Sequence, residues 1–154
     1  GQSAQHNRRM KVRVVPERMR RGVDPNFHPK LGRGGLSDIE WTVQLLQLQH
    51  AHTYPELQVT STRAALEAAT QAGLLSLDDE DTLWIAWSRA TATRNALALA
   101  RGKSLDVLPI QGEILASVAA ICGWPVNSGA AYVENYLKST RRARKVVERV
   151  FWEE

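Results

Sequence analysis

The sequence has little cysteine and no long apolar run. Cys122 is the only cysteine among 154 residues. It cannot form an internal disulfide, and it leaves a zinc ion without a second thiolate. No apolar run approaches the ~18 residues that span a membrane, and the first residues are polar rather than signal-like. We therefore exclude a disulfide scaffold and a membrane span, and we expect a cytoplasmic chain.

Sequence motifs for self-contained catalysis are also missing. There is no Walker sequence for phosphate binding, and no nucleophile stands beside a base in a recognisable pattern. His50 and His52 are two residues apart near a predicted helix end, where their side chains diverge. We expect no metal site and no catalytic residue within this chain.

The charge that is present is moderately basic, with 20 Lys and Arg against 16 Asp and Glu. One group of cations lies between Arg8 and Arg33, where only Glu17 and Asp24 oppose it. A second group consists of Lys138, Arg141, Arg142, Arg144 and Lys145. Because the second group spreads around its helix, it is typical of a solvated surface, and an acidic protein partner is the alternative.

Helical periodicity dominates the sequence after residue 36. We predict helices at 38–51, 61–72, 77–100, 112–122 and 129–151. Gly73, Gly102 and Gly123 mark helix ends, whereas Ser76 precedes a helix start. Nearly all sides of the 38–51 helix carry apolar residues, so we expect it to be the spine of the fold. The predicted fold is an all-α bundle of five or six helices without a sheet.

The segment before this bundle is harder to assign. Residues 5–19 fit neither helix nor strand cleanly, and we predict a helix over a competing short strand. Glycines and prolines predict a loop at 20–35. We count the chain as one domain, with a basic helix and glycine-rich loop at 1–35 and the bundle at 36–154.

One predicted helix carries an unusual stripe of inward residues. Leu83, Trp87, Ala90, Arg94 and Leu97 follow the helical spacing, with Arg94 as the charged exception. Trp84 lies on the same face as Trp87. We expect the tryptophans to be core residues.

A basic glycine-rich loop leads directly into the first helix of the bundle. Ser37 and Glu40 have the spacing of a capping box, so the helix is predicted to begin at Asp38. Lys30, Arg33 and the amides of Gly34 and Gly35 can hold a phosphate together, with a solvated basic loop as the alternative.

The two acids of this stretch, Asp38 and Glu40, point about 200° apart on a helix, so they cannot both ligate one metal ion. The plain interpretation is structural. Asp38 favours the helix dipole, and Glu40 completes the capping box.

This stretch also resembles a known family. The Gly34-Gly35 pair, Asp38-Ile39-Glu40 and the segment from Trp41 to His50 together resemble the glutamine synthetase adenylyltransferases, also called adenylyl-removing enzymes. The resemblance runs from about Met10 to Trp152. It is to the helical domain that follows a nucleotidyltransferase domain in the C-terminal half of actinobacterial members. PII uridylyltransferases share a related glycine-glycine helical domain and are the nearest alternative.

The resemblance implies an enzyme that transfers AMP from ATP to a tyrosine of glutamine synthetase and removes it again. In that family a Gly-Ser pair and an Asp-x-Asp hold magnesium in the neighbouring domain, and this chain lacks that pattern. We therefore expect a supporting and recognition domain that binds neither ATP nor Mg²⁺ alone. Its implied partners are glutamine synthetase, a PII-type signal protein and the remaining domains of the enzyme.

The resemblance also implies a position for the loop beside the catalytic cleft of the missing domain. The candidate residues for one wall of that cleft are Lys30, Arg33, Gly34, Gly35, Asp38 and Glu40.

Two other classes of function remain open. A basic helical module that binds nucleic acid predicts an affinity that falls steeply with salt. Against it, no helix-turn-helix with a polar recognition helix emerges, so nucleic acid is a disfavoured partner. An independent enzyme is disfavoured because no nucleophile, base or metal cluster is evident.

Overall fold

The computed structural model describes residues 24–101 and 107–152. These residues form five α-helices and two short 3-10 helices, with no strand among them. The α-helices are α2 (Leu36–His50), α3 (Thr62–Gln71), α4 (Leu77–Arg101), α5 (Glu113–Ile121) and α6 (Gly129–Trp152). The 3-10 helices are η1 (Pro25–Phe27) and η2 (Pro55–Leu57). The all-α prediction is confirmed, while the helix predicted at 5–19 lies outside the described residues.

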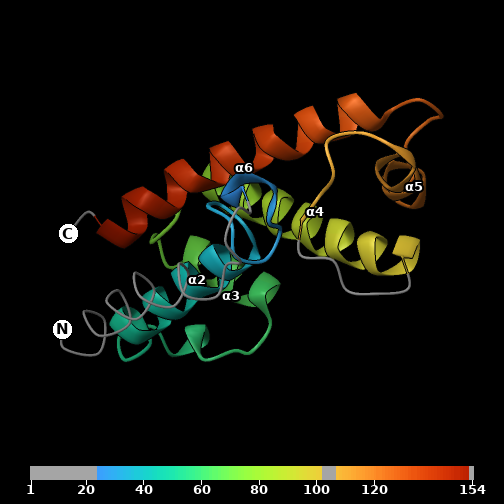
Figure 1. The fold of residues 1–154 in the computed structure, drawn as a ribbon. Coiled ribbons are helices and arrows are strands. Elements are labelled where there is room, and N and C mark those ends of the chain that lie inside the picture. The colour runs from blue at the N-terminus through green and yellow to red at the C-terminus, as the bar shows by residue number, and fades with distance from the viewer. Residues whose placement is uncertain (1–23, 102–106, 153–154) are drawn as a thin grey trace.

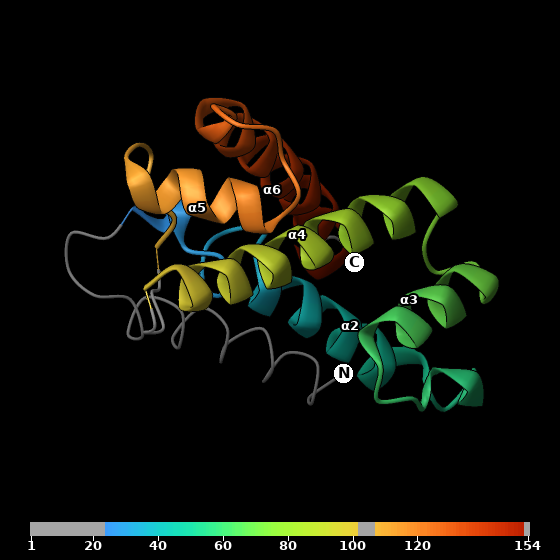
Figure 2. The ribbon, with the colours of Figure 1, turned by 90° about the vertical axis from the view of Figure 1, so that its right-hand side faces the viewer.

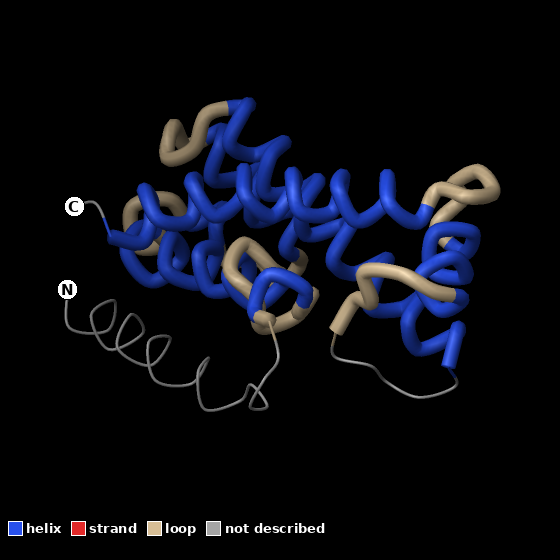
Figure 3. The backbone as a smooth tube through the Cα atoms, turned by 45° about the horizontal axis from the view of Figure 1, so that its top comes forward, coloured by secondary structure: helices blue, strands red, loops and turns tan. Residues whose placement is uncertain are grey.

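Helix α4 is the spine of the described fold. It contacts each of the other four α-helices. Figures 1 and 2 show α4 running the length of the molecule beside α6, with α5 near one end and α3 near the other. The described residues in Figure 3 are helix and loop only. Our prediction that the first helix of the bundle is the spine is wrong, since α2 lies to one side and leaves Leu48 56% exposed.

The core consists of two main clusters joined by α4 and α6. The first cluster takes Leu83 from early α4 and Val147 from late α6, together with residues of α2 and α3. The second takes Leu97 from late α4 and Tyr136 from early α6, together with residues of α5. The start of one long helix thus packs on the end of the other. The two helices are antiparallel, and each crosses both clusters.

Several helix ends follow the sequence signals. The Ser61 hydroxyl accepts a hydrogen bond from the Ala64 amide at 3.2 Å, and the Ser76 hydroxyl accepts one from the Asp79 amide at 3.0 Å. Gly73, with φ at 78°, follows the end of α3. The predicted helix start after Ser76 and the predicted end at Gly73 are confirmed, whereas the cap at Ser61 was not predicted. A serine cap and a left-handed glycine need partners only within the same turn.

The predicted inward stripe on α4 departs from the structure at one residue. Arg94 is exposed, and its neighbour Thr93 is fully buried, with its hydroxyl hydrogen-bonded to Tyr132. A guanidinium without a partner costs far more to bury than a hydroxyl that has one. Trp84 and Trp87 share a face as predicted, with ring centroids 5.1 Å apart, although both are only half-buried.

No helix in the part of the chain that the structure describes is both long and apolar enough to cross a membrane.

A pair of leucines two residues apart on α4 tests the second core cluster. Leu97 is 0% exposed and Leu99 is 72% exposed. Leu97→Ala leaves a cavity and is expected to lower the free energy of unfolding by about 2–5 kcal/mol. Leu99→Ala is expected to change it by less than about 0.5 kcal/mol. Urea unfolding followed by circular dichroism measures both, and equal effects would contradict the described packing.

Candidate functional site

Four of the six candidate wall residues lie in a hydrogen-bonded loop, which we call the glycine loop (residues 28–37), and Asp38 and Glu40 follow it in α2. Four of its amides donate to carbonyls within the same loop. They are Gly32 to His28 at 2.8 Å, Gly35 to Gly32 at 2.9 Å, Leu36 to Pro29 at 2.8 Å and Ser37 to Lys30 at 2.9 Å. The imidazole Nδ1 of His28 also accepts from the Leu31 amide at 2.9 Å. The loop is therefore a compact turn with its own hydrogen bonds.

The start of α2 differs from the predicted capping box. The helix begins at Leu36, two residues earlier than predicted, and Gly35 is its N-cap without a side-chain hydrogen bond. The Asp38 carboxylate reaches back instead, and its Oδ2 accepts from the Gly34 amide at 2.8 Å. The predicted box is wrong because the amides of Leu36 and Ser37 already bond to loop carbonyls. This pairing begins the helix before Ser37 can cap it.

The same contacts bear on phosphate binding by this loop. Gly34 and Gly35 are buried, and their amides donate to Asp38 and to the Gly32 carbonyl. The Asp38 carboxylate, itself only 5% exposed, takes the place next to the helix start where an anion would bind. In this structure these two amides are therefore already paired, which favours the alternative of a solvated basic loop.

The three glycines are required by close backbone contacts, one of them with α6. A Cβ on Gly34 would lie 2.1 Å from the Thr140 carbonyl oxygen, and the residue has φ at +72°. A Cβ on Gly32 would lie 2.1 Å from the Pro25 carbonyl, and one on Gly35 would lie 2.6 Å from the Pro29 carbonyl. The loop backbone thus packs directly against α6 and against itself, and side chains larger than hydrogen do not fit.

The side chains of the six candidates face different surroundings. Arg33 is exposed and Lys30 is half-buried. Asp38 is buried against Gly34. Glu40 turns elsewhere, because its Oε1 accepts from the Trp87 indole Nε1 at 3.4 Å. The structure brings Gly34 and Asp38 into contact, separates Glu40 from them, and leaves Arg33 as the candidate with an exposed side chain.

Glu40 belongs to a chain of contacts that the sequence did not reveal. The Arg63 guanidinium lies over the Trp84 ring, 4.7 Å from its centroid. Trp84 stacks on Trp87 at an interplanar angle of 14°, and Trp87 donates to Glu40. These contacts join α3, α4 and α2. Glu40 is therefore tied into the bundle through Trp87 rather than through Ser37.

The remaining charged candidates are consistent with surface positions. His50 is half-buried at the end of α2, and His52 is exposed. Within residues 24–101 and 107–152, no group of three or more His, Cys, Asp or Glu is placed to hold a metal ion. In the basic run of α6, Arg141, Arg142 and Lys145 are exposed.

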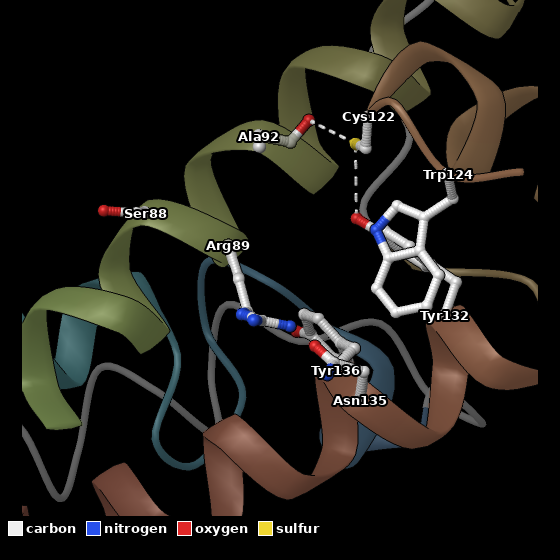
Figure 4. A pocket seen from close by; sticks show the side chains of 8 residues that line it. All are labelled: Ser88, Arg89, Ala92, Cys122, Trp124, Tyr132, Asn135 and Tyr136. Atoms are coloured by element: carbon white, nitrogen blue, oxygen red, sulfur yellow. Dashed lines mark hydrogen bonds between the residues drawn. The ribbon is translucent and has the colours of Figure 1, made fainter.

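A pocket of about 230 Å³ lies away from the glycine loop, between α4, α6 and the turn after α5. Figure 4 shows the eight residues that line it, which are Ser88, Arg89, Ala92, Cys122, Trp124, Tyr132, Asn135 and Tyr136. The Tyr132 hydroxyl contacts Thr93 and lies 3.4 Å from the Cys122 sulfur. This pocket could not be predicted from the sequence because its residues come from three separate segments.

The two tyrosines of the pocket are uncharged near neutral pH. Burial raises the pKa of the Tyr132 phenol above its ordinary value, and the hydrogen bond with Cys122 raises it further. Burial likewise raises the pKa of Tyr136. Among the eight lining residues, Arg89 is the one with a cationic side chain.

Two glycines with similar backbone angles test the packing of the loop on α6. Gly73 has φ at +78°, and a Cβ there would meet nothing within 4 Å. Gly73→Ala is expected to cost only the backbone strain, about 1–2 kcal/mol. Gly34→Ala adds a clash with the Thr140 backbone and is expected to cost at least about 2 kcal/mol more. Chemical unfolding measures both, and equal costs would show that the loop does not press on α6.

Comparison with known proteins identifies the family to which this chain belongs. The family model described as GlnD PII-uridylyltransferase matches residues 5–153. The bifunctional glutamine synthetase adenylyltransferase/adenylyl-removing enzyme of Mycobacterium avium is 56% identical over 94% of this chain and 14% of that protein. The enzyme of the same name from Corynebacterium glutamicum is 54% identical over 94% and 14%. That from Mycolicibacterium smegmatis is 52% identical over 97% and 15%.

These matches confirm the resemblance seen in the glycine loop. The chain spans about one seventh of the length of these relatives. The family model carries the name of the alternative considered above, the uridylyltransferase, whereas these relatives are adenylyltransferases. The chain therefore belongs to the GlnD PII-uridylyltransferase family, and within it is similar to the adenylyltransferases of actinobacteria.

Proposed function

We propose that this chain is the helical supporting and recognition domain of a larger glutamine synthetase adenylyltransferase/adenylyl-removing enzyme. The observation that carries the proposal is high identity over nearly the whole chain to one short part of such enzymes. The names of those relatives state the reaction, which is transfer of an adenylyl group to glutamine synthetase and its removal. The complete enzyme acts in the cytoplasm with ATP as the AMP donor and a tyrosine as the acceptor.

In this proposal the chain does not hold the nucleotide alone. The Gly-Ser and Asp-x-Asp pattern that binds magnesium in nucleotidyltransferase domains is missing from its sequence. ATP and Mg²⁺ are bound by the remaining domains, and this domain supports them. Alone, it transfers no AMP. Glutamine synthetase and a PII-type signal protein are the partners that the complete enzyme recognises.

The glycine loop forms one wall of the adenylylation site, with a different role for each residue. Arg33 is exposed and presents a planar cation suited to phosphate oxygens, and half-buried Lys30 lies three residues before it. Asp38 acts through Gly34, because its carboxylate holds that amide at 2.8 Å and so fixes the loop. Gly34 lets the loop lie against α6, and Gly35 lets it lie against its own Pro29 and Gly32 carbonyls. Glu40 anchors α2 to Trp87.

A second candidate is the same wall in a PII uridylyltransferase, which the name of the family model favours. The two candidates differ in the acceptor protein. An enzyme that contains this chain is expected to transfer AMP to glutamine synthetase and not UMP to a PII-type protein. The opposite result would replace our proposal with the second candidate.

Arg33→Ala in the complete enzyme tests the wall. Loss of one hydrogen bond from a guanidinium to a phosphate is worth about 1.5–3 kcal/mol. We therefore expect kcat/KM for Mg-ATP in adenylylation to fall by about 10- to 100-fold. Steady-state assays that follow AMP incorporation into glutamine synthetase measure the change.

The control for this variant is Arg94→Ala, which removes an exposed arginine from α4. It is expected to leave the adenylylation kinetics unchanged. Asp38→Ala is expected to lower activity through the loop, with partial recovery in Asp38→Asn, which keeps an acceptor for the Gly34 amide. If Arg33→Ala and Asp38→Ala both retain normal kinetics while the enzyme still modifies glutamine synthetase, the wall assignment is wrong but the function stands.

A further inference from the structure

The pocket between α4 and α6 contains a cation without an anionic partner. Arg89 lines it, and no residue that the structure describes makes an ion pair or hydrogen bond with its guanidinium. Figure 4 shows the Arg89 side chain extending from α4 toward Asn135 and Tyr136 on α6. Both tyrosines are neutral, so the charge of the lining side chains favours an anion.

The pocket also contains an acceptor without a donor. Asn135 lines it, and its Oδ1 is buried without a hydrogen-bond partner in the described part of the chain. The Asn135 backbone is fixed within α6, and its carbonyl accepts from the Ser139 hydroxyl at 3.1 Å. The terminal amide turns easily about its last torsion. When this turn brings the oxygen to the surface of the pocket, an O–H or N–H group of a ligand can satisfy it.

The remaining walls are flat and mostly apolar. Trp124 meets Tyr132 edge to face, with centroids 5.5 Å apart. The Tyr132 hydroxyl is already engaged with Thr93 and Cys122, so this side chain acts as a wall and not as a donor to a ligand. A volume of about 230 Å³ lies below the range of about 300–1,000 Å³ that is common for drug-sized ligands. The space suits a small, planar molecule.

We propose that this pocket binds a small carboxylate that has a planar apolar body and a hydroxyl group next to the carboxylate. The carboxylate pairs with Arg89, the hydroxyl donates to Asn135, and the planar body lies against Trp124 and Tyr136. A hydroxyl suits the site better than an ammonium group, because a second cation beside Arg89 is repelled. This binding site goes beyond the proposed function and does not depend on it.

Because the pocket is lined by residues of the core, ligand binding is expected to raise the stability of the folded chain. Tyr132 and Tyr136 belong to the second core cluster, and Trp124 packs against it. A ligand that binds only the folded chain raises its unfolding temperature in a concentration-dependent way. Trp124 also places a fluorescent ring at the site.

Three matched compounds test the proposal. Mandelate carries the carboxylate, the hydroxyl and a phenyl ring, phenylacetate lacks the hydroxyl, and 1-phenylethane-1,2-diol lacks the charge. We expect mandelate to raise the unfolding temperature of the chain and to quench tryptophan fluorescence at millimolar concentration. We expect phenylacetate to bind about threefold more weakly and the diol at least about tenfold more weakly.

Two variants and a control identify the groups involved. Arg89→Gln is expected to weaken mandelate binding at least about tenfold and to remove its preference over the diol. Asn135→Ala is expected to remove the preference of mandelate over phenylacetate. Arg94→Gln, which changes an exposed arginine on the same helix, is expected to bind mandelate normally. Circular dichroism checks that each variant keeps its helices.

The proposal is overturned if mandelate and the diol bind the unmodified chain equally. It is also overturned if a folded Arg89→Gln variant binds mandelate as the unmodified chain does, or if none of the three compounds shifts the unfolding temperature.

Discussion

The hydrogen bond from the Gly34 amide to the Asp38 carboxylate is the interaction on which the candidate site depends. It closes the glycine loop over the first turn of α2 and holds Gly34 where its Cα lies against the Thr140 backbone of α6. Both partners are buried, so leaving the amide unpaired would cost about 1–3 kcal/mol. The Asp38 carboxylate thus fixes the loop that carries the exposed Arg33.

The architecture explains why such a fixed loop is available. Helices α4 and α6 cross both core clusters, and the glycine loop is attached to the second of these helices. The η1 turn before the loop extends this attachment, since the Phe27 carbonyl accepts from the Leu108 amide at 2.8 Å and Leu108 belongs to the second cluster. A loop held at both ends by the bundle presents an exposed side chain with little loss of conformational entropy on binding.

The sequence predicted features that depend on neighbouring residues and failed where distant residues compete. The cap at Ser76 needs only its own helix turn, and it formed. The Ser37–Glu40 box did not, because Glu40 is taken by Trp87, which is 47 residues away, and the Ser37 amide bonds to Lys30. The pocket escaped prediction for the same reason, since Arg89 and Asn135 lie on different helices. The resemblance to adenylyltransferases could be recognised from the sequence because the residues that carry it lie within one short segment.

Hydrogen exchange at the Gly34 amide is the most direct test of the central claim that the loop is fixed to the bundle. Native-state exchange measured by NMR gives the free energy of the opening that exposes each amide. If Asp38 and α6 hold this amide as described, the Gly34 amide exchanges only through the global unfolding that also exposes the amide of the buried Leu97. Exchange of Gly34 through a local opening, at a free energy close to that of the exposed turn at Thr53, would contradict the account.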